Sequence, residues 1–169
     1  MNDGLNDGFA HNAWANALLL DLCRPLTADQ FQTTVPGTFG SIIDTLWHVI
    51  AAEGGYYFRL SGKSVAWDRR ASTPPPFAEI EAAADDLRVR WQEFLTVQFD
   101  AEVQIPIPWD DAQTVNVRSG VILMQALHHG NEHRSQVATA LTTLGITIPD
   151  WGLWNWAEVS GRATFAANQ

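Results

Sequence analysis

The chain has 169 residues, of which 46% are hydrophobic and 17% are charged, a composition typical of a folded globular protein. This length predicts a single domain over residues 1–169 with a sizeable buried core. The formal net charge of −9 argues against general binding to nucleic acid or to anionic membranes, because both would repel such a surface.

The N-terminal sequence and the cysteine content bear on the cellular location of the protein. The sequence starts without a signal-peptide pattern, and no apolar stretch is long enough to cross a bilayer. Cys23 is the one cysteine, so no internal disulfide can form and the fold should not need an oxidising compartment. Its position at an expected helix end suits a small, half-buried hydrophobic residue better than a nucleophile. We therefore expect a cytoplasmic protein.

The first part of the chain predicts two long helices. Apolar residues at helical spacing indicate a helix over Phe9–Leu22, which Pro25 closes. Thr27–Gln30 matches a capping box that opens one short turn. A second helix is expected over Ser41–Leu60, and His48 lies among its buried positions.

Two features of this second helix call for a physical reason. Asp44 stands one turn before His48, where its carboxylate could orient the imidazole or could be a solvated first-turn residue that favours the helix dipole. Gly54 and Gly55 each weaken a helix by about 1 kcal/mol relative to alanine. We expect them to permit close helix packing or to leave room for a ligand.

The middle of the chain predicts a third helix and then an extended segment. After a loop over residues 61–76, apolar spacing indicates a helix over Phe77–Phe99. Between Ala101 and Ser119, apolar and polar residues alternate around Trp109-Asp110-Asp111, which suggests two short strands or an extended excursion. Pro106 and Pro108 would restrict a strand there to an edge.

A fourth long helix is expected over Val121–Leu144. Its ends are apolar, but no apolar side chain occurs in residues 128–136, although the helix must pack along its whole length. His129 and His133 are one helical turn apart, which places both imidazoles on one face, as two ligands of one metal ion require. Such a pair alone also fits ordinary core or surface histidines.

The last segment predicts a short helix over Trp151–Arg162. Trp151, Trp154 and Trp156 are too apolar to remain in solvent, so we expect this tail to pack on the other helices, line a pocket mouth or meet another subunit. Together the segments predict an all-α four-helix bundle with a short extended or β excursion and a short C-terminal helix.

In a bundle, His48 on the second helix can meet His129 and His133 on the fourth. Three neutral imidazoles suit Zn(II), Ni(II) or Fe(II) and leave a coordination position for water or a thiol. The other histidines fit less well: His128 points about 100° away from His129, and His11 suits a surface role. Either Glu132 or Arg134 could reach a ligand or an ion-pair partner.

With these motifs the chain resembles the DinB-like (DinB/YfiT-type) family of metal-dependent four-helix-bundle proteins. The resemblance rests on HNAWAN, FGSIIDTLWHVIAAE, HHGNEHRSQV and LGITIPDWGLWNWAE, which begin at His11, Phe39, His128 and Leu144. In that family a histidine of the second helix and an H-x-x-x-H-R motif hold the metal, which implies His48, His129 and His133 as ligands. Many relatives have a histidine where this chain has Glu132.

The resemblance also implies an up-down-down-up bundle, a homodimer and a thiol-dependent S-transferase or isomerase. Its small-molecule cosubstrate would be a low-molecular-weight thiol such as mycothiol, bacillithiol or glutathione. The expected function is metal-dependent activation of a thiol for attack on an electrophile. Two alternatives are a metal-dependent hydrolase and a non-catalytic, stress-related module that binds a metal or ligand.

Overall fold

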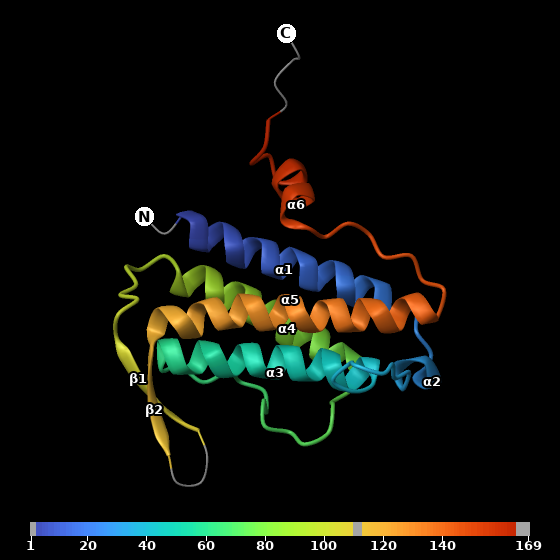
Figure 1. The fold of residues 1–169 in the computed structure, drawn as a ribbon, viewed down its shortest axis with the longest axis horizontal. Coiled ribbons are helices and arrows are strands. Elements are labelled where there is room, and N and C mark those ends of the chain that lie inside the picture. Colours follow the sequence, from blue (N-terminus) through green and yellow to red (C-terminus); the bar gives the residue numbers. More distant parts are fainter. Residues whose placement is uncertain (1–2, 110–112, 165–169) are drawn as a thin grey trace.

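The computed structural model describes residues 3–109 and 113–164 of the chain. Four long helices form a bundle in which α1 and α5 run in one direction and α3 and α4 in the other (Figure 1). This arrangement confirms the up-down-down-up prediction. The bounds of the long helices are α1 Asp3–Cys23, α3 Ile42–Ser61, α4 Phe77–Phe94 and α5 Ser119–Thr143. The shorter elements are α2 Ala28–Phe31, β1 Gln104–Pro108, β2 Thr114–Arg118 and α6 Leu153–Val159.

Each long helix packs against two others: α3 and α1 both contact α4 and α5. The apolar stripes of all four meet in one core, which includes Leu19, Leu46, Leu87, Leu123 and Leu141. Cys23 lies in this core as a small hydrophobic residue, as predicted, but it is fully buried instead of half-buried. No helix in the described part of the chain is both long enough and apolar enough to cross a membrane.

The start of α3 is stabilised by a capping box. Ser41 Oγ accepts a hydrogen bond from the backbone N–H of Asp44, and the Asp44 carboxylate accepts one from the backbone N–H of Ser41, both at 3.3 Å. Asp44 also accepts a bond from the Ser41 hydroxyl. Asp44 is therefore a partly exposed acidic residue in the first turn of α3, as one of the two alternatives predicted, and its carboxylate caps the helix. Within the described residues no hydrogen bond joins Asp44 to His48. The predicted capping box at Thr27, which opens the short helix α2, is confirmed as well.

Two helix boundaries differ from prediction. Helix α1 begins at Asp3, earlier than expected, and α4 ends at Phe94 instead of Phe99. After Leu95 the chain leaves the helix in order to enter the hairpin, and the start of α5 ties that segment down through Gly120 N–H to Ala101 O at 3.0 Å. Tertiary contacts therefore override the helical pattern of residues 95–99.

The segment between α4 and α5 is an antiparallel hairpin, which confirms the two expected strands. Ile105 pairs with Val117 and Ile107 with Val115, and Pro106 lies on β1, a strand with one neighbour. The hairpin lies at the end of the bundle where α3 ends and α5 begins (Figure 1). Asp110 and Asp111 lie outside the described residues.

The tail partly contradicts its prediction. Helix α6 is shorter than expected. Trp156 is buried and Trp151 half-buried, as packing on the other helices requires, whereas Trp154 is 89% exposed and does not pack on the bundle. Contact with another subunit stays a prediction for Trp154. His11 is half-buried instead of free at the surface: its Nε2 lies 2.8 Å from the carbonyl oxygen of Trp151. This contact, and ring contacts with Trp156, attach the tail to α1.

Candidate metal centre

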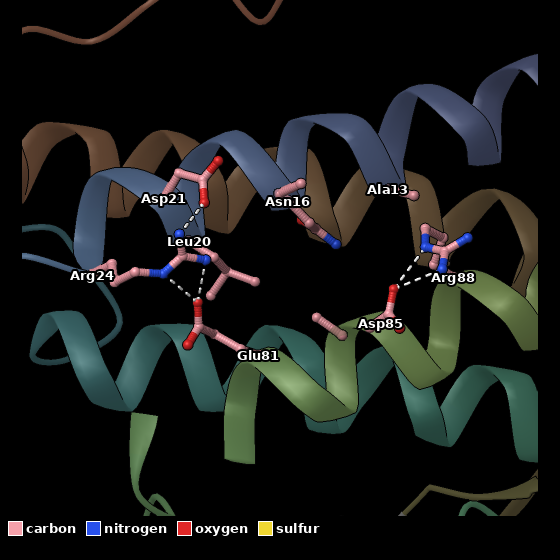
Figure 2. A pocket seen from close by; sticks show the side chains of 10 residues that line it. Ala13, Asn16, Leu20, Asp21, Arg24, Glu81, Asp85 and Arg88 are labelled. Carbon is pink, nitrogen blue, oxygen red and sulfur yellow. Dashed lines mark hydrogen bonds and ion pairs between the residues drawn. The ribbon is translucent and has the colours of Figure 1, made fainter. Parts of the chain in front are cut away.

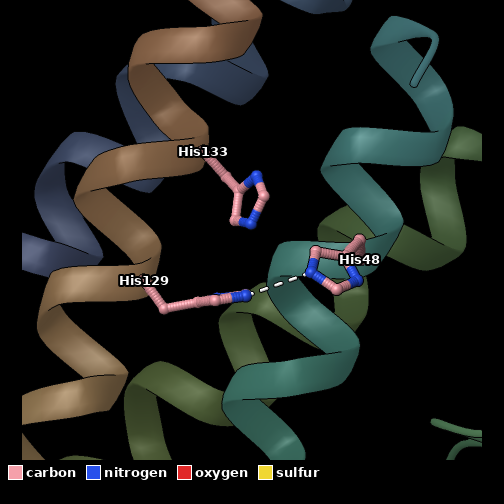
Figure 3. A group of neighbouring side chains, drawn as sticks. All are labelled: His48, His129 and His133. Atoms are coloured by element: carbon pink, nitrogen blue, oxygen red, sulfur yellow. Dashed lines mark hydrogen bonds between the residues drawn. The ribbon is translucent and has the colours of Figure 1, made fainter. Parts of the chain in front are cut away.

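Three histidines from two helices converge where α3 packs against α5 (Figure 3). One ligand atom from each of His48, His129 and His133 lies within 4.8 Å of the other two, so the group could hold a metal ion. His48 Nε2 and His129 Nε2 are 3.0 Å apart. We call these three residues the histidine triad; it is the set that the sequence predicted.

The spacing of the triad fits one shared cation. Two nitrogens that each lie about 2.1 Å from a tetrahedral or octahedral ion are roughly 3 to 3.5 Å apart. The His48–His129 distance is already in that range, and the 4.8 Å limit leaves only a small side-chain movement for the third nitrogen. Three imidazoles also form the donor set of known catalytic zinc sites.

Gln136, one turn after His133, determines how that imidazole is protonated. Its side-chain Oε1 accepts a hydrogen bond from the backbone N–H of Phe39 at 2.9 Å and lies 2.9 Å from His133 Nδ1. An N–H group can only donate, so the amide atom there must be oxygen, and His133 Nδ1 must carry a proton. The Nε2 lone pair of His133 is left for a cation. Gln136 was not among the residues predicted from the sequence; its i+3 position after a predicted ligand was the available signal.

Phe39 covers one side of the triad. Its ring stacks on His48 with centroids 3.9 Å apart and meets His133 edge-on at 5.6 Å. Burial lowers the pKa of His48 and, together with the other imidazoles, lowers the pKa of His129 to about 4. Both rings are therefore neutral at physiological pH and can offer lone pairs.

The residues around the triad motif have separate roles. His128 and Glu132 are exposed, whereas Arg134 is 2% exposed and faces α1 instead of the triad. Its Nη1 donates to Asn12 Oδ1 at 2.6 Å and to Asn16 Oδ1 at 2.9 Å. Among the described residues Arg134 forms neither of the predicted contacts, with a ligand or in an ion pair; its hydrogen-bond partners are two neutral amides.

The same two amides connect Arg134 to a buried carboxylate. Asn12 Nδ2 and Asn16 Nδ2 donate to Glu53 Oε2 at 3.1 and 3.4 Å. Burial raises the pKa of Glu53, against the effects of Asn12 and Arg134, and lowers the pKa of Arg134 to about 10. We call these four residues the Arg134 network. Gly130 makes room for it, since a Cβ there would lie 2.8 Å from Asn12 Oδ1.

Two hollows open beside His48. The larger, about 780 Å³, lies between α3, α5 and the hairpin and is called the hairpin cavity. The smaller, about 390 Å³, lies near Phe39 and the loop before α4. His48, Ala51 and Arg69 line both. Both glycines of α3 are explained by their surroundings. Gly54 packs against Trp67, and Gly55 lines the hairpin cavity.

Comparison with known proteins identifies the family. The sequence model of the DinB family matches residues 1–157, which include the bundle, the hairpin and the histidine triad. The chain belongs to the DinB family. A DinB-family relative, Protein DinB of Bacillus subtilis (strain 168), is 23% identical over 164 residues, which cover 92% of this chain and 95% of that protein. The similarity therefore extends over the fold and is not confined to the histidine motif.

Proposed function

We propose that the protein binds a divalent metal ion through His48, His129 and His133 and is a metal-dependent transferase that activates a low-molecular-weight thiol for attack on an electrophile. The convergence of the three ligand atoms at the α3–α5 contact carries this proposal. DinB-family membership, shown over residues 1–157, supports it.

The residues of this chain hold the site ready for a cation. The lowered pKa values keep His48 and His129 deprotonated, so a metal ion need not displace protons from them at neutral pH. Gln136 holds the ring of His133, and Phe39 limits access of water to His48. When bound, a divalent ion lowers the pKa of a thiol or water molecule that joins it, which provides a nucleophile at neutral pH.

The pair of hollows favours a reaction with two organic substrates. A hydrolase needs one substrate besides water, whereas a transferase must place two molecules beside the same reacting atoms. Here the cavities of about 780 and 390 Å³ share His48 on their walls. Cys23 cannot replace the external thiol, because burial raises its pKa to about 12.

The first experiment measures metal content after purification without a nickel column. We expect about one equivalent of metal in the wild type and none in the His129→Ala/His133→Ala double variant. His128→Ala is the matched control, since this neighbouring imidazole is exposed and outside the triad. Stoichiometric metal in the double variant would overturn the assignment.

The second experiment measures the loss of free thiol with a panel of electrophiles, in the presence and absence of metal. Turnover that requires metal, thiol and intact histidines supports the transferase. Metal-dependent ester or amide cleavage without thiol would favour a hydrolase instead. A metal effect on melting temperature with no turnover of any kind would favour a non-catalytic binding module.

A further inference from the structure

The hairpin cavity has an apolar wall and a floor that leads away from the triad. The wall comes from the hairpin, through Ile107, Val115 and Val117. The floor follows one face of α3, from His48 through Gly55 to Arg59, at helical spacing. His48 and Gly55 are seven residues apart, so they are separated by about 10 Å along the helix.

Two arginines meet at the far end of this floor. Arg59 is in the last turn of α3, and Arg69 is in the loop before α4. A Cβ placed on Gly55 would lie 3.4 Å from Arg59 Nη1 and 3.5 Å from Arg69 Nη1. A Cβ at these distances would be in ordinary van der Waals contact with both groups, so the two guanidinium groups lie near one point of the cavity beside Gly55.

Neither of these arginines forms an ion pair with the residues 3–109 and 113–164. Arg59 Nη1 donates only a long bond, 3.4 Å, to the carbonyl of Gly55, and the Arg69 guanidinium lies over the Phe58 ring at 5.2 Å. Burial lowers the pKa of Arg69, and the charges of Arg70 and Arg59 lower it further. The charge of Asp68 opposes this shift only in part. Two like charges close together are unfavourable, and an anion between them reduces that cost.

A groove between α1 and α4 shows the ordinary arrangement for this protein. In the groove, of about 180 Å³, Arg24 pairs with Asp21 at 3.0 Å and with Glu81 at 2.7 Å (Figure 2). Arg88 pairs with Asp85 at 2.7 Å in the same view (Figure 2). These charges are satisfied by the chain itself. The net charge of −9 also means that carboxylates are abundant, yet within residues 3–109 and 113–164 none forms an ion pair with Arg59 or Arg69, and Asp68 acts on Arg69 only as a nearby charge.

We propose that the hairpin cavity binds a small carboxylate with an apolar body, whose carboxylate lies on Arg59 and Arg69 and whose other end reaches the histidine triad. Planar guanidinium groups match carboxylates through paired hydrogen bonds, and the apolar hairpin wall suits a hydrocarbon or aromatic body. The distance from His48 to Gly55 sets the length of the ligand at about 10 Å. This inference rests on the proposed function only for the end of the ligand that reaches the triad. The placement of its carboxylate depends on Arg59 and Arg69 alone.

The test measures binding of octanoate by calorimetry to the full-length protein, first without metal. We expect an Arg59→Gln/Arg69→Gln variant to bind octanoate roughly 10- to 100-fold more weakly than the wild type, because charge-assisted hydrogen bonds are lost. Arg88→Gln is the matched control and should bind octanoate as the wild type does. Equal octanoate affinity in the wild type and the double variant, or no binding to the wild type, would overturn the proposal.

A second variant does not remove charge. Gly55→Ala places a methyl group where the two guanidinium groups converge, so we expect weaker octanoate binding without a lower melting temperature, since alanine favours helix. Unchanged octanoate affinity in Gly55→Ala would count against the assigned position. Octyl phosphate that binds through the arginines where octanoate does not would overturn the choice of carboxylate.

A comparison with ω-mercaptooctanoate and ω-mercaptooctanol distinguishes the source of the carboxylate. If metal loading tightens binding of mercaptooctanoate but not of octanoate, the carboxylate belongs to the thiol substrate. If metal loading changes the affinity of neither compound, while both still bind more weakly to the arginine double variant, the carboxylate belongs to the electrophile. The effect of the arginine double variant on octanoate binding is measured without metal. A triad that fails to bind metal therefore leaves this effect unchanged, whereas a failed carboxylate site abolishes it. Mercaptooctanol should bind equally to the wild type and the arginine double variant.

Discussion

The histidine triad and the Arg134 network are two polar clusters built from neighbouring residues of α5. His133 faces α3 and Arg134 faces α1, because consecutive helical residues point about 100° apart. In the network each charge has partners: amides of α1 link the guanidinium of α5 to the carboxylate of α3. In the triad, three ligand atoms face one another.

This difference in hydrogen bonding indicates that the Arg134 network is a structural cluster and that the histidine triad is a site for a ligand. A buried guanidinium and carboxylate that are linked through hydrogen bonds position their helices and leave little to offer an external molecule. In the Arg134 network, the Nε–H of Arg134 has no hydrogen-bond partner within the described residues. Neutral imidazoles that face one another satisfy only part of their hydrogen-bonding capacity, and a cation can take up the rest. We therefore expect the network to govern stability and the triad to govern metal binding.

The largest expected effect is the loss of stability on breaking the network. Arg134→Met leaves Glu53 buried without its cation, and we expect the free energy of unfolding to fall by about 3 kcal/mol or more. Denaturant unfolding of the metal-free protein measures this. Arg88→Met, which breaks an exposed pair on α4, should cost less than about 1 kcal/mol. A similar loss in both variants would contradict the structural role of the network.

The second effect concerns the triad and should be specific to metal. A zinc concentration 100-fold above the dissociation constant should stabilise the wild type by about 2.7 kcal/mol. The His129→Ala/His133→Ala variant should gain nothing from zinc, while Arg134→Met should still gain. Thermal unfolding with and without zinc gives both values. Zinc stabilisation that disappears in Arg134→Met, in a protein that remains folded, would show that the two clusters are not separable.

A smaller effect is expected from the residue that orients His133. Gln136→Leu removes the acceptor for His133 Nδ1–H, and we expect metal affinity to fall by about 10- to 100-fold. Gln136→Glu, which retains an acceptor oxygen, should recover most of the affinity. Competition with a chromogenic chelator measures both, and Gln92→Leu on α4 is the control. Equal affinity in Gln136→Leu and the wild type would exclude the orienting role.

The smallest effect, because solvent partly screens the half-buried His129, is a pH dependence in the metal-free protein. The pKa of His129 is lowered from its ordinary value of 6.5 to about 4, so between these values the unfolded chain binds the proton and the folded chain does not. Stability should therefore fall as the pH is lowered from 6.5 towards 4. His129→Asn should flatten this part of the profile, whereas exposed His128→Asn should not. A profile that is unchanged in His129→Asn would argue against a neutral buried imidazole.

Local patterns in the sequence were sufficient for most of the fold. Apolar spacing located the long helices, and short-range capping residues such as Thr27 and Ser41 marked helix starts. The end of α4 could not be predicted in this way, since residues 95–99 continue a helical pattern that the hairpin connection interrupts. The sequence also could not tell that Trp156, and not Trp154, packs on the bundle, because composition does not say which side of a short helix meets it.

For the candidate site, the sequence by itself determined which residues could be ligands, because the spacing of His129 and His133 is a property of one helix. Only the tertiary structure decided that His48 reaches them, that Gln136 connects Phe39 to His133, and that Arg59 and Arg69 converge on Gly55. The physical reason is the range of the interactions. A helix sets the relation between residues within a few turns, whereas contacts between distant segments depend on how all four helices pack around a common core.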